Sequence, residues 1–179
     1  MGCGIRAGDV IENDFRIDKG LEKSINNNKF MEKINLDALN LHNKYREKHN
    51  SENLILSDNL CKKAQKKIFD LINGNDDKRD DLEEDNKLGE NIYISLKDDV
   101  DVKKACEAWY VEGKLYDFNK NAYQRGTTHF TQMVWKGTKE IGFGYSQLKN
   151  GKSYFIALYF PSGNELFKFK ENVEKRLDP

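Results

Sequence analysis

The sequence contains little cysteine, proline or histidine, and it has no long apolar run. Its 179 residues include three cysteines, two prolines and three histidines. Only Cys61 and Cys106 fall in segments with a regular pattern, so we expect no disulfide framework and a reducing compartment. No stretch approaches the roughly 18 apolar residues that span a bilayer. Charged residues interrupt every apolar run near the N-terminus, and we therefore expect no secretory signal peptide.

The chain also lacks an excess of charge of either sign. Thirty lysines and arginines balance thirty aspartates and glutamates, so the formal net charge is zero. Proteins that bind nucleic acids normally carry a one-sided basic surface, and we expect no nucleic-acid partner. The length suits one domain with a hydrophobic core and is short for two.

Two parts of the chain differ in their pattern. Residues 1–34 are polar and are predicted to be an extension with little regular structure, whereas residues 35–179 are predicted to be the folded domain. Apolar spacing and capping residues predict helices over 36–50, 57–74, 101–113 and 130–135. Alternating residues predict strands over 91–96, 141–145 and 154–158, with a hairpin turn at Asn150-Gly151. Helices beside a small antiparallel sheet indicate an α+β fold.

The segment 75–87 is dominated by charge. It holds seven acidic and three basic residues. It lacks the glycine and the ligand spacing of an EF-hand loop, so we predict a solvated loop here rather than a calcium site.

Four separated stretches resemble the signature motifs of the CAP superfamily (cysteine-rich secretory, antigen 5 and pathogenesis-related proteins), in the family's order. They read HNKYR at 42–46, GENIY at 89–93, HFTQMVW at 129–135 and YFIALYFPSGN at 154–164. The resemblance implies an α-β-α sandwich. Within the superfamily the chain is similar to the intracellular, membrane-attached branch of Golgi-associated plant pathogenesis-related proteins. Ala157 stands where many secreted members have a disulfide cysteine, and residues 169–173 resemble that branch's tail.

The resemblance also implies a polar cluster in a central cleft. Members of the family commonly hold two histidines and two glutamates there, which in some members bind a divalent metal. Three of these positions are matched by Glu90 of the GENIY stretch, His129 of the HFTQMVW stretch and Glu112 of a further segment, WYVE at 109–112. No histidine occurs between His49 and His129. One histidine and two carboxylates form a mostly oxygen ligand set, which would bind magnesium or calcium weakly rather than zinc tightly. Alternatively, Arg79 neutralises the two glutamates through a bidentate ion pair.

Each histidine and glutamate also has a structural interpretation. Glu90 and Glu112 could hold the loops around the cleft by accepting backbone hydrogen bonds, and His129 could line the cleft without reacting. We predict His42 to be a buried hydrogen-bonding residue and His49 to lie at the surface. A metal-assisted hydrolase or protease that uses this cleft is an alternative function, although no HExxH, GxSxG or Cys–His motif is present. We assign no catalytic residue and expect no cofactor beyond a weakly bound divalent metal.

A binding function agrees better with the sequence than catalysis does. Members of the family bind sterols or fatty acids, and in some the loop before the HFTQ motif carries the sterol-binding role. Here that loop offers the rings of Tyr116, Phe118 and Tyr123 as flat apolar surface. The alternative is that these rings only cover the base of the loop. A homodimeric protein-interaction module is the third candidate function.

The first residues resemble a lipidation signal. Gly2 is the acceptor for myristoylation once Met1 is removed, and Cys3 is a typical palmitoylation partner, although Arg6 stands where the signal prefers Ser or Thr. One myristoyl chain binds membranes with a constant of only about 10⁴ M⁻¹, so stable attachment requires a second acyl chain on Cys3. We expect the protein at the cytoplasmic face of the Golgi or plasma membrane, with a soluble cytosolic protein as the alternative.

Overall fold

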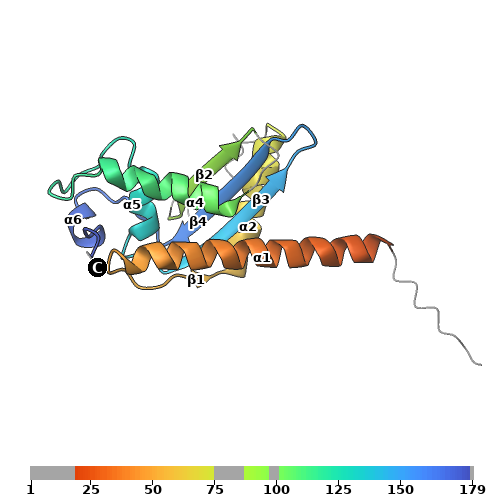
Figure 1. Cartoon of the computed structure of the whole chain (residues 1–179), viewed down its shortest axis with the longest axis horizontal. Coiled ribbons are helices and arrows are strands. Elements are labelled where there is room, and N and C mark those ends of the chain that lie inside the picture. The colour runs from red at the N-terminus through yellow and green to blue at the C-terminus, as the bar shows by residue number, and fades with distance from the viewer. Residues whose placement is uncertain (1–18, 75–86, 97–100, 178–179) are drawn as a thin grey trace, which may run out of the picture.

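The computed structural model describes residues 19–74, 87–96 and 101–177. Its centre is a four-stranded sheet in the order β1-β3-β4-β2 (Figure 1). The strands are β1 (Ile55–Leu56), β2 (Gly89–Ser95), β3 (Glu140–Gln147) and β4 (Ser153–Phe160). β4 pairs antiparallel with both β2 and β3, and its pairing with β3 is the hairpin that Asn150-Gly151 predicts. The short β1 pairs parallel with β3 and has no clear signal in the sequence, so the sheet is mixed rather than wholly antiparallel.

Helices cover both faces of this sheet. α2 (Asp58–Ile72) lies on one face, and α1 (Lys19–Glu47), α4 (Val102–Val111) and α5 (Thr128–Val134) lie on the other. The alternation along β4 divides the core, because Tyr154, Ile156 and Leu158 pack with α2 while Phe155, Ala157 and Tyr159 pack on the opposite side. The 3₁₀ helix η1 (Glu112–Leu115) continues α4, and α6 (Phe169–Asn172) lies near the C-terminus. The α-β-α sandwich that the resemblance implied is confirmed.

α1 begins earlier than the sequence pattern predicts. The expectation of little regular structure is wrong for residues 19–34, which form the N-terminal half of α1. Ile34 and Ala38 are buried, and the ring of Phe30 meets that of Tyr145 edge-on with 5.7 Å between centroids. Packing on one side of the helix stabilises it although the asparagine run around 26–28 has low helix propensity. Residues 1–18, which include both predicted acylation sites, and 75–86, which include Arg79, lie outside the described residues.

Side chains of α2 close the outer edge of β3. β1 covers only the first two residues of β3, and in the described structure no strand pairs with the rest of this edge. The backbone N–H of Phe143 donates to Cys61 Sγ at 3.4 Å, and that of Tyr145 donates to Gln65 Oε1 at 3.1 Å. α2 can approach this closely because Gly142 faces it: a Cβ there would lie 2.3 Å from the backbone nitrogen of Cys61. These edge donors are therefore satisfied without a further strand.

Candidate functional site

Helix α5, which carries the HFTQMVW motif, is held at its C-terminal end by a buried arginine. The guanidinium of Arg46 donates hydrogen bonds of 2.7–3.1 Å to four backbone carbonyls, those of Glu52, Met133, Trp135 and Thr138. Burial lowers the pKa of Arg46 to about 10, so the side chain stays protonated at neutral pH. A positive charge at this end also complements the helix dipole.

The carboxylate of Glu112 holds the other end of α5. Its Oε2 accepts hydrogen bonds from the backbone N–H groups of His129 at 3.0 Å and Phe130 at 3.3 Å. Its Oε1 accepts a third from Nδ1 of His129 at 2.7 Å. Thr127 stands at the N-cap position without a side-chain hydrogen bond to the helix, so Glu112 replaces the capping residue from outside the helix. The structural interpretation of Glu112 is therefore supported.

The ring of His129 keeps one nitrogen free of Glu112. Nδ1–H donates to the carboxylate, Nε2 does not contact Glu112, and the side chain is 37% exposed. The ring lies close to parallel with that of Trp109, with 6.2 Å between centroids. A carboxylate that orients an imidazole in this way is found behind histidine bases and histidine metal ligands. We refer to these two residues as the Glu112–His129 pair.

Glu90 is not brought to this pair. On β2, Gly89 faces α5, and Asn91 donates a hydrogen bond to the carbonyl of His129. Glu90 lies between them and points to the opposite face of the strand, where it forms an ion pair with Lys67 of α2 at 2.5 Å. Within the described ranges, no group of three or more His, Cys, Asp or Glu side chains is placed to hold a metal ion. The three residues grouped by motif are thus divided, and weak metal binding stays a prediction.

A buried chain of hydrogen bonds lies behind the Glu112–His129 pair. Nδ1 of His42 carries a proton, because it donates to the carbonyl of Ala38 at 2.8 Å, and the hydroxyl of Tyr159 donates to Nε2 at 2.9 Å. Asn91 donates to that hydroxyl at 3.0 Å and to the carbonyl of His129 at 3.1 Å. Burial lowers the pKa of His42 to about 4, so the ring is neutral at neutral pH. The prediction of a buried, hydrogen-bonded His42 is confirmed.

His49 is buried as well, and the prediction of a surface position is wrong. Only 3% of the residue is exposed. Its Nδ1–H donates to the carbonyl of Glu174 at 2.7 Å, and the hydroxyl of Tyr110 donates to its Nε2 at 3.0 Å. The C-terminal segment causes this burial by returning to the end of α1, where the N–H of Leu177 donates to the carbonyl of Lys48 at 2.8 Å. Burial lowers the pKa of His49 from its ordinary value.

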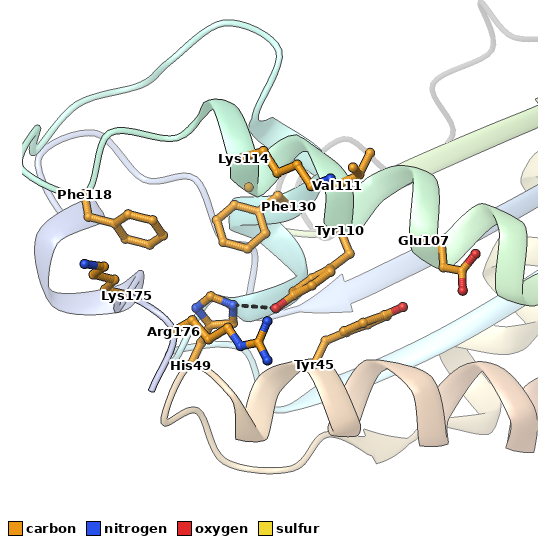
Figure 2. A pocket seen from close by; sticks show the side chains of 11 residues that line it. Tyr45, His49, Glu107, Tyr110, Val111, Lys114, Phe118, Phe130, Lys175 and Arg176 are labelled. Carbon is orange, nitrogen blue, oxygen red and sulfur yellow. Dashed lines mark hydrogen bonds between the residues drawn. The ribbon is translucent and has the colours of Figure 1, made fainter. Parts of the chain in front are cut away.

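An aromatic pocket of about 410 Å³ lies between the end of α1 and α4 (Figure 2). Tyr45 stacks on Tyr110 with 3.9 Å between ring centroids, and His49 meets Phe130 edge-on at 5.2 Å. These rings give the pocket mostly apolar walls, to which four charged side chains are added. The lining residues are Tyr45, His49, Glu107, Tyr110, Val111, Gly113, Lys114, Phe118, Phe130, Lys175 and Arg176.

The three aromatic residues of the predicted lipid-binding loop differ in position. Tyr116 is buried against Phe130, with 5.9 Å between centroids, so it covers the base of the loop. Phe118 lines the aromatic pocket. Tyr123 is 54% exposed. The loop therefore contributes one of its three rings to the pocket.

Sequence reasoning missed the other walls of the pocket. Tyr45 and His49 stand four residues apart and would share a side of the helix predicted over 36–50, which is the local signal that could have indicated them. In the structure α1 ends at Glu47, and His49 lies in the turn after it. No local pattern indicates that Lys175 and Arg176 line the same space, because they are distant in sequence from α1 and α4.

Two helical layers around one sheet, with a glutamate–histidine pair beside an aromatic pocket, define an α-β-α sandwich domain with two adjacent candidate sites. Residues 39–160 match the family model described as the cysteine-rich secretory protein family, CAP, and the chain belongs to this family.

Two relatives extend this assignment. The chain is 37% identical to Golgi-associated plant pathogenesis-related protein 1 of Homo sapiens over 139 residues, which cover 76% of this chain and 90% of the relative. It is 30% identical to salivary antigen-5 of Dipetalogaster maximus over 145 residues, which cover 73% of this chain and 57% of that longer relative. The resemblance stated from the four motifs is confirmed.

Solved structures agree in fold. The structure of Schistosoma mansoni venom allergen-like protein 4 matches with a TM-score of 0.61 at 21% identity and covers 81% of this chain and 96% of its own. The structure of BmVAL-1 matches with a TM-score of 0.62 at 24% identity and covers 82% of this chain and 84% of its own. At these identities the likeness concerns the fold alone.

Proposed function

We propose that this CAP domain binds a lipid with an acyl chain, and that the aromatic pocket holds the chain. The observation that carries the proposal is a space of about 410 Å³ walled by the rings of Tyr45, Tyr110, Phe118 and Phe130. Ligand sites in proteins are typically clefts of about 300–1,000 Å³ with mostly apolar walls. The hydrogen bonds of His49 are already made by Tyr110 and by the backbone, so these walls do not require a polar ligand.

The charges of the pocket favour an acidic headgroup. Lys114, Lys175 and Arg176 line the pocket, against one acidic residue, Glu107. A carboxylate would gain charge-assisted hydrogen bonds to these cations, whereas the single hydroxyl of a sterol carries no charge. Of the two lipid classes that the resemblance implies, a fatty acid therefore fits this pocket better.

A substitution that fills the pocket tests this proposal. Val111 lines the pocket and is 48% exposed, so Val111→Trp adds an indole there without disturbing the buried core. We expect a fluorescent fatty acid to bind the wild type saturably and this variant at least about tenfold more weakly. Leu115→Trp is the matched control, because Leu115 is exposed one turn further on and does not line the pocket.

Two results would contradict the proposal: non-saturable binding to the wild type, or equal affinities of the wild type and Val111→Trp. Tighter binding of a fluorescent sterol than of the fatty acid would contradict the argument from the headgroup. Wild-type affinity in Leu115→Trp is required for the loss in Val111→Trp to be assigned to the pocket.

The Glu112–His129 pair does not favour hydrolysis as a second function. A histidine base needs an orienting carboxylate and a nucleophile within hydrogen-bonding distance. Glu112 orients His129 but is also bound by two backbone N–H groups, and Glu90 is paired with Lys67. Both glutamates are thus engaged in contacts that hold the fold.

We also propose that the protein works at a membrane, on its cytoplasmic face. The human relative carries the words Golgi-associated in its name. None of the helices in the described ranges has an apolar stretch long enough to cross a bilayer. Acylation of Gly2 and Cys3 stays a prediction, and Cys3→Ser is expected to move the protein from the membrane fraction of a cell lysate to the supernatant.

A further inference from the structure

Phe167 exposes an aromatic ring from a strained backbone position. Its φ is +66°, a left-handed conformation that bulky side chains rarely adopt. The residue is 81% exposed, and its neighbour Leu166 is exposed as well. A strained turn that holds an apolar ring outward gains no burial within the fold, which indicates a role in contact with something else.

Hydrogen bonds from two directions hold this turn in place. The side chain of Asn121 donates to the carbonyl of Phe167 at 2.9 Å and accepts from the N–H of Lys170 at 2.9 Å. Asn164, at the start of the turn, donates to the carbonyl of Thr128 at 3.0 Å. The turn is thereby fastened to the loop before α5, which carries the exposed Tyr123. We call Tyr123, Leu166 and Phe167 the apolar tip.

Basic residues outnumber acidic ones in the two segments that carry the apolar tip. The segments 114–126 and 164–171 together hold five basic and three acidic residues. Two of the acids are paired within their own turns, since Asp117 lies 3.6 Å from Lys120 and Glu165 lies 2.7 Å from Lys168. The net charge of these two segments is therefore positive. Exposed apolar side chains among basic ones are typical of surfaces that enter the headgroup region of an anionic bilayer.

We propose that the apolar tip inserts into the headgroup region of an anionic bilayer and orients the domain there. The loop after η1 and the turn before α6 lie at one end of the molecule, and the N-terminal end of α1 projects from the other (Figure 1). The loop that is tied to the tip also supplies Phe118 to the aromatic pocket (Figure 2), so docking of the tip brings the pocket to the lipid surface. The tip does not line the pocket, and the proposal is independent of what the pocket binds.

Sedimentation with vesicles tests the proposal, using the full chain produced without acylation. We expect it to sediment with vesicles of phosphatidylcholine and phosphatidylserine, and about tenfold less with phosphatidylcholine alone. Phe167→Asn removes the ring and suits the backbone, because asparagine tolerates positive φ better than phenylalanine does. We expect this variant to have an unchanged or higher Tm and to bind the mixed vesicles at least about tenfold more weakly.

Phe69→Gln is the matched control, because Phe69 is also an exposed phenylalanine but lies on α2, on the other face of the sheet. It should bind vesicles as the wild type does. Wild-type binding by Phe167→Asn, an equal loss in Phe69→Gln, or no binding of the wild type to either vesicle would overturn the proposal. Val111→Trp should keep vesicle binding and lose the fatty acid, and Phe167→Asn should do the reverse, so the two proposals fail independently.

Discussion

Two neighbouring residues of α5 belong to two different sites. In one site polar groups bind the helix, and in the other the polar groups bind each other and leave apolar ring faces exposed to the space. His129 belongs to the Glu112–His129 pair, where one carboxylate accepts three hydrogen bonds from the start of α5. Phe130 belongs to the aromatic pocket, where the polar atoms of His49 and Tyr110 bind each other and ring faces line the space. A glutamate and a histidine, residue types that suggest catalysis, therefore hold this fold together. The aromatic side chains, which suggest ordinary packing, instead line a space that could hold a ligand.

Acidification gives the largest expected effect, and it acts on the hydrogen-bonded chain behind the pair. Burial lowers the pKa of His42 from its ordinary value of 6.5 to about 4 in the fold. Below pH 6.5 the unfolded chain therefore binds a proton that the folded protein excludes, so stability is lost as the pH falls from 6.5 toward 4. This residue alone should lower the free energy of unfolding by about 2 kcal/mol between about pH 7 and pH 5.

Urea denaturation at both pH values measures this loss. His42→Gln is less stable at neutral pH but lacks the titrating ring, so its free energy of unfolding should change much less over the interval. If the variant and the wild type lost the same amount, groups other than His42 would be responsible.

Removal of the Glu112 carboxylate should have an effect almost as large. Glu112→Ala leaves two backbone N–H groups at the start of α5 and Nδ1 of His129 without their acceptor. We expect the free energy of unfolding to fall by about 2 kcal/mol, and by about half as much in Glu112→Gln, which keeps one acceptor oxygen. Denaturation in urea provides the measurement. An unchanged stability in Glu112→Ala would show that the carboxylate does not hold the start of α5, and the contrast between the two sites would disappear.

The smallest effect is expected from the pocket's own polar group. Tyr110→Phe removes the hydroxyl that donates to Nε2 of His49 and keeps the stacked ring. We expect a loss of about 1 kcal/mol in the free energy of unfolding. The affinity for a fatty acid should change less than about threefold, because the wall stays apolar. A loss of affinity as large as that in Val111→Trp would identify the hydroxyl as a ligand contact and would contradict the distinction drawn between the two sites.

Several of the regular elements could be predicted because each of these has a local cause. Asp101 was predicted to begin a helix, and its side chain accepts a hydrogen bond from the N–H of Lys103 at 2.9 Å. The alternation along β4 likewise matches the division of its side chains between two cores. The N-terminal half of α1 could not be predicted in this way. This part of the helix is stabilised by the burial of Ile34 against other elements, and its own residue composition does not favour a helix.

Motifs indicated which residues belong to the candidate site, but not how these residues are placed relative to one another. Glu112 and His129 come from separate motifs, and the structure brings them together. Glu90 comes from a motif too, but its direction depends on which face of β2 it occupies, and a motif does not state that. The burial of His49 depends on a carbonyl of the C-terminal segment, a contact between distant parts of the chain that no local pattern records.

The closed edge of β3 limits the ways in which a second copy of the chain could bind. Two sheets join along their edges when each offers unpaired backbone donors and acceptors. On this edge the donors of Phe143 and Tyr145 are already used by Cys61 and Gln65. A strand arriving from another molecule would first have to displace both side chains, with the loss of two hydrogen bonds before any new one formed. A homodimer of this protein would therefore assemble through its helices, its loops or another strand rather than by extending the sheet across β3.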